Sequence, residues 1–528
     1  MEQTLVGLPT MAAPAEWDTA TILTSLAWAG ALCLFLFFTR RSSAESSFKA
    51  RIPPGPRGWP IIGCFTYLAK FPELTLDKWA KKYGSLFSFT IGNQRFVAIS
   101  DPNIVKDLVI NNGATFSSRK DMYMKAQLVF ARRGVTATQY NDTWRKHRRL
   151  AAMFLTTRAV AGYMPGLERE AKVMIHDLYI RSKAGTAPIN PQRFASRASL
   201  NNILTLTFGF RTESIDDKLV SDSLRLSREF MNTTGPVANL VDFIPLLQKF
   251  PNHMATRGRA LSRELVEICG AMIRDIDAAL KRGDPYPDCM AKYLLQNREA
   301  EQLDDLDIIV LCGAFMIGGV ETTSSVKQWF AAHIPTLPEV QARARAELDS
   351  VCGRDRLPTA DDEAEMPYIH AIVKEIERCH NPFWLGTPHM NTEDYEYNGF
   401  LIPKNTVIIL NTWNMHHNPE RYPDPYEFKP ERYLDDKLTC ADSANLANPM
   451  ERDHWTFGAG RRICPGMALA EREIFLAVSH LLWAFQMDEL PEEPIDLQEY
   501  DGLSGRSPVP NRIRLTPRDE HVAAILGV

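Results

Sequence analysis

The stretch from Leu303 to Ile334 constrains the fold most, because apolar side chains surround the centre of any helix built from it. A helix with no polar face at its middle is stable only where other parts of the protein cover it on all sides. We therefore expect a long helix that runs through the protein interior, with further helices packed around it.

The middle of this stretch carries the run GGVETT (318–323), which is poorly suited to a core helix. Each glycine weakens a helix by about 1 kcal/mol relative to alanine, and a buried carboxylate needs a partner to offset its desolvation. Two explanations remain open from the residues alone. Either a ligand approaches the backbone here, or a neighbouring helix packs closely against the glycines.

The chain after residue 60 is mostly helical in pattern, with a few short strand-like runs. Residues 85–100 hold two such runs separated by Asn93-Gln94, which predicts a β-hairpin, and residues 406–413 predict another strand. No proline- or glycine-rich linker divides residues 60–528, so the fold expected is mainly α with a minor β part, in a single domain. The further predicted helices cover residues 165–182, 260–282, 337–351 and 466–485.

Composition excludes several classes of protein. The 528 residues carry a formal net charge of −4, which gives no basis for binding nucleic acid. The nine cysteines are scattered and form no Cys-x-x-Cys pair, so zinc ribbons and thioredoxin-like sites are not expected. An odd and dispersed set of thiols favours a reducing compartment.

The N-terminal region differs from the rest, since the 21 residues from Thr19 to Thr39 carry no charge. This length spans a bilayer as a helix. Acidic residues precede the run while Arg40 and Arg41 follow it, so the positive-inside rule places the larger part of the chain in the cytosol. A cleaved signal peptide is the alternative, although no small-x-small cleavage site closes the run.

Residues 51–63, RIPPGPRGWPIIG, contain four prolines and three glycines and are not expected to form a helix. We interpret them as a stiff linker between membrane and globule, although an ordinary surface loop has the same composition. The predicted organisation is a lumenal N-terminus at 1–18, a transmembrane anchor at 19–39, a basic and proline-rich hinge at 40–59, and one catalytic domain at 60–528.

The loop FGAGRRICPG (457–466) leads into a helical pattern and places Cys464 just ahead of it. A cysteine there can be a buried small hydrophobe, a nucleophile, one half of a disulfide or a metal ligand. The helix start stabilises a thiolate, glycines allow a flat partner to approach, and Arg462 can bind a carboxylate. Haem, with iron on sulfur and propionates on arginine, is one ligand that suits these features.

The loop resembles the haem-binding signature of the cytochrome P-450 family, F-x-x-G-x-R-x-C-x-G, at all five fixed positions. Other elements of the family occur in the expected order, so the resemblance covers the chain from the anchor to beyond residue 510. These elements are the W-x-x-x-R of the C helix (Trp144 to Arg148), the oxygen-activating groove of the I helix (318–323), the E-x-x-R of the K helix (Glu375 to Arg378) and the P-E-R element (Pro430 to Tyr433).

This resemblance implies the family's α-rich prism with an N-terminal transmembrane helix, and haem b bound through the thiolate of Cys464. Glu321 and Thr322 are the implied catalytic pair, which delivers protons while O₂ is activated. Two further groups are implied: a buried structural network of ion pairs formed by Glu375, Arg378 and Arg432, and haem contacts from Trp144, Arg148, His389, Arg462, Phe457, Gly458 and Gly466.

One departure from the family pattern follows the E-x-x-R element. Asn381 stands where proline is common, and the proline comes one residue later as Pro382. Two aromatic residues come next, so we expect an altered, aromatic ceiling above the haem. The predicted pocket suits a medium-sized, partly aromatic molecule, and its candidates are Met122, Met124, Phe130, Phe315, Phe383, Trp384, Leu385 and Leu503.

Residues 397–433 most resemble filamentous-fungal enzymes of secondary metabolism, which implies hydroxylation of an aromatic or polyketide-type metabolite; oxidative phenol coupling by the same haem stays open. No flavin or nicotinamide fingerprint is present, so the resemblance implies electrons from NADPH through a cytochrome reductase at the endoplasmic reticulum membrane, with the catalytic domain cytosolic. An O₂-independent isomerase or dehydratase would not need Glu321 and Thr322, and a haem sensor would need no anchor facing a reductase.

Overall fold

The computed structural model describes residues 51–68, 70–498, 500–502 and 505–528. The predicted lumenal segment, anchor and most of the hinge therefore lie outside the described residues. The described residues belong to two compact units. The larger unit holds Pro53–Tyr395 and Ile402–Val528, and the smaller contains residues 51–52 and Glu396–Leu401.

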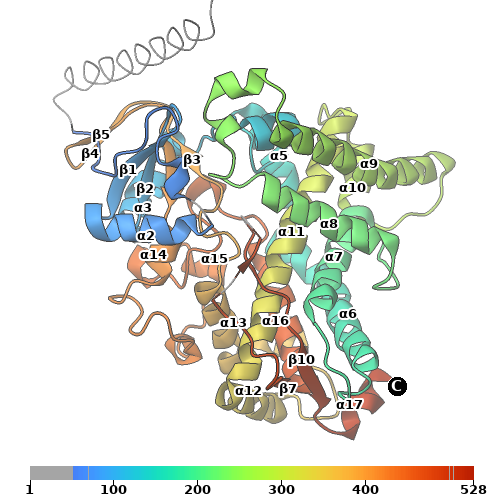
Figure 1. Ribbon diagram of the computed structural model, residues 1–528. Helices are drawn as coiled ribbons and strands as arrows, with labels where there is room; N and C mark the ends of the chain where they lie inside the picture. The colour runs from blue at the N-terminus through green and yellow to red at the C-terminus, as the bar shows by residue number, and fades with distance from the viewer. Residues whose placement is uncertain (1–50, 69, 499, 503–504) are drawn as a thin grey trace, which may run out of the picture. The chain divides into compact units, whose positions relative to one another are not determined.

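Helices dominate the larger unit, so the predicted fold class, mainly α with a minor β part, is confirmed (Figure 1). The helices are α2 (Pro72–Tyr83), α3 (Pro102–Val105), α4 (Gly113–Phe116), α5 (Asp142–Met153), α6 (Thr157–Arg181), α7 (Gln192–Phe208), α8 (Lys218–Thr233), α9 (His253–Arg282), α10 (Met290–Gln296), α11 (Asp305–His333), α12 (Pro338–Val351), α13 (Pro367–Cys379), α14 (Thr412–His416), α15 (Cys440–Ser443), α16 (Met467–Ala484) and α17 (Glu520–Leu526). The five long helices predicted from the sequence all form, with ends shifted by a few residues.

The long apolar helix lies in the interior, as its composition predicts. Asp304 caps α11 through a reciprocal capping box with Asp307, which satisfies backbone N–H groups that a helix start otherwise leaves unpaired. Helices α7, α8, α9 and α16 contact α11 (Figure 1). Among the described residues, Asp305–Thr336 is also the helical stretch long and apolar enough to cross a membrane, but most of it is buried within the fold.

The largest sheet has the strand order β1-β2-β6-β3 and contains the predicted hairpin. Strands β1 and β2 are antiparallel, with Ile91 opposite Gln94, so the turn is Gly92-Asn93 and lies one residue earlier than predicted. Strand β6 pairs parallel with β2 and antiparallel with β3. The strands are β1 (Leu86–Ile91), β2 (Gln94–Ile99), β3 (His389–Met390), β4 (Tyr395–Tyr397), β5 (Phe400–Ile402), β6 (Val407–Leu410), β7 (Phe485–Glu489), β8 (Tyr500–Asp501), β9 (Ser507–Pro508) and β10 (Ile513–Pro517).

The proline-rich segment is attached to this sheet from Pro53 onward. The Pro53 carbonyl accepts a hydrogen bond from Ser88 Oγ at 2.6 Å, and the Pro54 carbonyl accepts one from Ser88 N at 2.7 Å. A Cβ at Gly55 would lie 1.6 Å from the Ser88 carbonyl oxygen, so only glycine fits there. The segment is therefore held against the edge strand β1 over its first residues.

A candidate haem pocket and the residues around it

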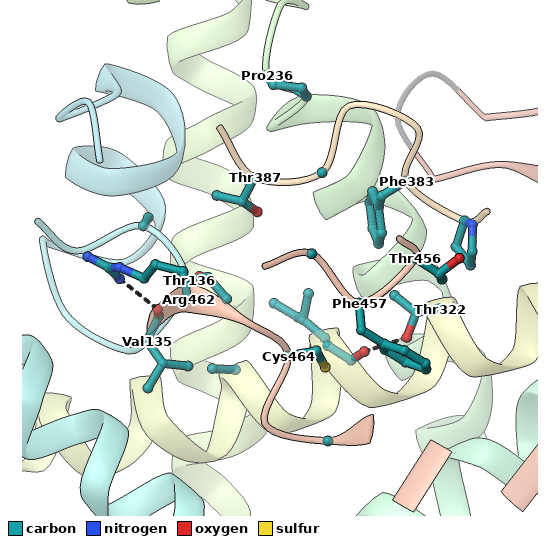
Figure 2. Close-up of a pocket in the computed structure, with 18 of the residues that line it drawn as sticks. Val135, Thr136, Pro236, Thr322, Phe383, Thr387, Thr456, Phe457, Arg462 and Cys464 are labelled. Atoms are coloured by element: carbon teal, nitrogen blue, oxygen red, sulfur yellow. Dashed lines mark hydrogen bonds between the residues drawn. The ribbon is translucent and has the colours of Figure 1, made fainter. Parts of the chain in front are cut away.

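A cavity of about 380 Å³ lies in the larger unit and is lined by Cys464 and by the Gly318–Thr322 face of α11. Small-molecule pockets have volumes of roughly 300–1,000 Å³. Figure 2 shows Cys464, Thr322, Phe383 and Arg462 around this space. The tertiary fold thus brings together two motifs that lie more than a hundred residues apart in sequence, and places Phe383 from the segment between them at the same cavity.

The Cys464 loop is shaped by its own backbone. Cys464 N donates a hydrogen bond to the Phe457 carbonyl at 2.9 Å, which closes the loop before α16 begins. Gly460 has φ +64°, and a Cβ there would lie 2.5 Å from the Val109 carbonyl oxygen, so the position requires glycine. Burial raises the pKa of the Cys464 thiol, while the backbone N–H of Gly466 and the positive charge of Arg148 oppose that shift.

Three arginines line the cavity without any carboxylate partner among the described residues. Arg462 donates to the carbonyls of Ser117, Val135 and Thr138, and Arg148 donates to the Ile463 carbonyl. Arg119 is 6% exposed, and its Nε and Nη1 atoms have no hydrogen-bond partner. Burial and the charges of Arg462 and Arg148 lower the pKa of Arg119 far below its ordinary value. The cluster therefore favours an anion with at least one carboxylate.

Two other predicted contacts lie close to this cluster. Trp144 is buried, stacks on the Arg462 guanidinium at 4.1 Å and donates its indole N–H to the Val135 carbonyl at 3.1 Å. His389 lines the cavity, and its Nδ1 lies 2.9 Å from the Phe116 carbonyl. Burial and the charge of Arg119 lower the pKa of His389, so the ring is neutral at pH 7. Trp144 thus holds Arg462 in place, while His389 faces the cavity directly.

The two adjacent glycines of α11 face different surroundings. A Cβ at Gly318 would meet nothing within 4 Å, and Gly318 lines the cavity. A Cβ at Gly319 would lie 2.4 Å from the Ile203 Cδ1 atom of α7. The close-packing explanation is therefore confirmed for Gly319, while the approach of a ligand at Gly318 stays a prediction.

The predicted catalytic pair separates into a residue in the cavity and a residue behind it. The Thr322 hydroxyl lines the cavity and donates to the Gly318 carbonyl at 2.7 Å, while α11 continues without a break (Figure 2). Glu321 is buried and does not belong to the lining among the described residues. Its Oε1 lies 3.1 Å from Nη1 of Arg228 on α8.

The Glu375, Arg378 and Arg432 side chains meet in one buried network. Arg378 binds the Glu375 carboxylate through Nε and Nη2, both at 2.7 Å, and Arg432 Nε reaches the same carboxylate at 3.2 Å. Arg378 Nη1 donates to the carbonyls of His416 and Pro425, and His416 Nε2 accepts from Trp455 N at 2.7 Å. The network thereby connects α13 to the chain that enters the Cys464 loop.

The pocket candidates divide into those that line the cavity and those that do not. Met122, Phe130, Phe315, Phe383 and Leu385 belong to the lining. Met124 and Trp384 do not, among the described residues, and Leu503 lies outside them. Met124 is directed against Gly258 of α9, because Asp242 holds the Met124 N–H at 2.8 Å and fixes that turn. Trp384 lines a smaller neighbouring cavity and packs edge-on against Trp413.

The shifted proline has a local explanation. Asn381 Oδ1 accepts the backbone N–H of Phe383 at 2.8 Å, and its Nδ2 donates to Thr412 Oγ1 at 3.3 Å. The Asn381 side chain therefore caps the turn that brings Pro382 and Phe383 to the cavity wall. The aromatic ceiling expected from the sequence consists of Phe383, because Trp384 faces away from this cavity.

A second cysteine near the Cys464 loop is enclosed in its own polar cluster. Cys440 Sγ lies 3.5 Å from His454 Nε2, which lies 3.1 Å from Glu377 Oε2. All three residues are buried, and Cys440 is absent from the cavity lining among the described residues. Burial raises the pKa of the Cys440 thiol, with Asp453 acting in the same direction. His454 is therefore engaged by Glu377 and Cys440 and does not activate Cys464.

Comparison with known proteins identifies the family. The family model described as cytochrome P450 matches residues 53–514. This chain belongs to the cytochrome P450 family. Among curated relatives, the cytochrome P450 monooxygenase fogE of Aspergillus ruber is 32% identical over 90% of this chain and 88% of its own length. The monooxygenase yanC of Aspergillus niger is 31% identical over 96% of both chains.

This P450 is a monooxygenase whose family carries haem bound through a cysteine thiolate. The residues present fit that cofactor. The orphaned Nε and Nη1 atoms of Arg119, the neighbouring Arg148 and Arg462, and the thiol of Cys464 all line one cavity. A flat ligand with a metal for the sulfur and carboxylates for the arginines satisfies these groups together.

Three residues of the site carry no signal in the sequence. Arg119 lies outside every recognised motif, and Arg228 reaches Glu321 from a different helix. Lys125, which also lines the cavity, lies in a segment that offers no helical or strand period. Motif spacing cannot reveal such residues, because the tertiary contacts that bring them to the site join segments that lie far apart in the sequence.

We expect Glu375→Gln to lower the free energy of unfolding by about 3–5 kcal/mol, because it leaves the fully buried guanidinium of Arg378 without its counter-charge. Urea denaturation followed by circular dichroism measures the change. The matched control is Asp284→Asn, which breaks the exposed pair with Arg282 and should cost less than about 1 kcal/mol. Equal effects of the two substitutions would contradict a structural role for the network.

Proposed function

We propose that this P450 oxidises a medium-sized, partly aromatic secondary metabolite by hydroxylation, with haem b held through the Cys464 thiolate. The observation that carries the proposal is the single cavity lined by Cys464, by the Gly318–Thr322 face of α11 and by three arginines that have no carboxylate partner among the described residues. When bound, haem with an axial thiolate supplies the activation of O₂. Phe457, Gly458 and Gly466 leave the space beside the sulfur in which the flat ring would lie.

In this proposal Arg119, Arg148, Arg462 and His389 bind the two propionates, and Trp144 keeps Arg462 in position. Support comes from the number of guanidinium N–H donors at this end of the cavity and the lack of a carboxylate partner for any of the three arginines in the described chain. Two ionised propionates would balance most of that positive charge. Their presence would also raise the lowered pKa values of Arg119 and Arg462 toward normal.

Thr322 is proposed to pass a proton into the cavity, and Glu321 to replace it from behind the helix. The hydroxyl of Thr322 already lines the cavity and donates a hydrogen bond to the Gly318 carbonyl. A small rotation about the C–O bond of Thr322 redirects this O–H donor toward the cavity. Glu321 directly precedes Thr322 in the chain and pairs with the part-exposed Arg228, which places the carboxylate between the cavity side of α11 and a side chain in contact with water. This arrangement suits a relay better than direct contact between Glu321 and the substrate.

The substrate class is proposed from the apolar lining. Met122, Phe130, Phe315, Phe383 and Leu385 present mainly carbon atoms to the cavity, and aromatic side chains bind flat aromatic ligands by stacking and by edge contacts. The fungal sources of the monooxygenase relatives, among them Aspergillus ruber and Aspergillus niger, fit a role in secondary metabolism.

Electrons are proposed to come from NADPH through a reductase on the endoplasmic reticulum membrane. The chain has no nucleotide-binding fingerprint of its own, and its family implies a redox partner. Exposed apolar side chains occur in the two chain segments that contact the hairpin turn at Gly92 through Ile62 and Phe243. These exposed side chains are Trp59, Ile61, Leu246 and Phe250, and they give the catalytic domain a surface suited to lipid.

The thiolate assignment predicts the carbon monoxide difference spectrum. The reduced full-length protein should show the red-shifted Soret band of a haem thiolate, and Cys464→Ala should lose it because the sulfur ligand is gone. Cys440→Ala is the matched control, since Cys440 is outside the cavity lining, and it should keep the band. Survival of the band in Cys464→Ala would end the assignment.

The proton role predicts uncoupling. Thr322→Ala should keep haem content and the carbon monoxide spectrum, yet release most reducing equivalents as hydrogen peroxide, with product per NADPH falling about 10-fold or more. Thr323→Ala tests an adjacent hydroxyl in the same helix. NADPH consumption that stays coupled to product in Thr322→Ala would refute the relay.

The propionate assignment predicts weaker haem retention in Arg119→Leu. One lost charge-assisted hydrogen bond is worth about 1.5–3 kcal/mol, so haem transfer to apomyoglobin should become about 10- to 100-fold faster. Arg132→Leu is the control, because Arg132 is exposed and pairs with Asp121 at 2.8 Å. Identical transfer rates in the two variants would show that Arg119 does not hold the cofactor.

A further inference from the structure

Lys125 is a basic side chain in the cavity that no acidic group of the described residues contacts. It lies on the short π-helix Tyr123–Val129 and lines the cavity, with Nζ 5.5 Å from the centre of the Phe230 ring. Among the described residues, no hydrogen-bond acceptor or ion pair engages its ammonium group. The neighbouring Arg132 differs, since it pairs with Asp121.

The ammonium group of Lys125 is withdrawn from water and has no counter-charge among the described residues. Burial lowers the pKa of Lys125 to about 8, and the positive charge of Arg119 acts in the same direction. The nearby Asp242 is engaged by the backbone N–H of Met124 and by the charge of Lys120. A weak contact with one aromatic face, worth about 0.5–1 kcal/mol at exposed sites, does not replace the hydration that the ammonium group loses.

Lys125 lies beside apolar side chains of the cavity wall. Its ring partner Phe230 is on α8, which contacts α11, and Phe230 packs on Phe130 with ring centroids 5.3 Å apart. Lys125 therefore lies on the side of α8 and α11, among the apolar residues proposed to receive the substrate. Arg462 and Arg148, which are proposed to bind propionates, contact the carbonyls of Ser117, Val135, Thr138 and Ile463 instead.

We propose that Lys125 is a specificity-determining residue that binds the carboxylate of an otherwise apolar, aromatic substrate. This inference rests on the proposed function and names the substrate class for the same cavity. An ammonium group beside the apolar wall formed by Phe130 and Phe230 selects a molecule that combines a flat carbon skeleton with one negative end. Pairing at that end fixes the orientation of the skeleton and thereby the carbon that is presented for oxidation.

Isothermal titration calorimetry at pH 7 on the full-length holoenzyme tests the proposal with 2-naphthoate and its neutral amide, 2-naphthamide. The wild-type protein should bind the acid at least about tenfold more tightly than the amide, as expected for a charge-assisted hydrogen bond. Lys125→Met should abolish that preference without weakening the amide, and Lys125→Arg should restore it. Lys218→Met, at the exposed start of the same α8 that carries Phe230, should leave both affinities unchanged.

Several outcomes would overturn the inference. Equal wild-type affinities for acid and amide, or a preference that persists in Lys125→Met, would show that Lys125 only packs its stem and extends its charge to solvent. Tight, Lys125-dependent binding of the un-ionised 2-naphthol would indicate recognition of a phenol in place of a carboxylate. Calorimetry needs no turnover, so failure here is distinguishable from loss of the carbon monoxide band, which would refute the proposed function. Unfolding curves of Lys125→Met and Lys125→Arg establish that both variants fold.

Discussion

The carboxylate of Glu375, shared by Arg378 and Arg432, is the interaction on which the site depends. All three charged groups are withdrawn from water, so the ion pairs persist only because every remaining donor of Arg378 finds an acceptor. Those acceptors are backbone carbonyls of a segment with little regular structure. Through His416 and Trp455 the same contacts position the chain that carries Cys464. The buried ion pairs thus fix the position of a segment that has few hydrogen bonds of regular secondary structure.

Two adjacent glycines of helix α11, Gly318 and Gly319, have different roles. Gly319 allows α7 to approach within van der Waals contact, while Gly318 leaves its side of the helix open toward the cavity. The Thr322 hydroxyl satisfies the Gly318 carbonyl, so the helix stays continuous where the glycines weaken it. The helix therefore serves both as the centre of the core and as one wall of the pocket, and a single substitution at either glycine would affect a different function.

Charge is distributed unevenly around the pocket. In the described part of the chain, the guanidinium groups beside the Cys464 loop have no carboxylate partner, and the ammonium group of Lys125 lies near Phe230 of α8, where the charge of Arg119 still acts on it. Each arrangement costs free energy in the protein alone, since burial opposes every one of these charges. The cost of burying these charges is offset when anions bind, with the two carboxylates of a cofactor at the arginines and an acidic substrate at Lys125. The ligands that we propose therefore complete the electrostatics of the fold.

The sequence by itself determined the helical class, the five long helices and the role expected of Cys464, because apolar periodicity and motif spacing are local properties of a chain. It also paired Glu375 with Arg378, three residues apart on one helix face. Only the tertiary structure decided that Met124 and Trp384 face away from the cavity, that Glu321 pairs with Arg228, and that Arg119 and Lys125 face into it. The physical reason is that loop segments take their orientation from distant partners, such as Asp242 beneath Met124, and no periodicity in the sequence records such contacts.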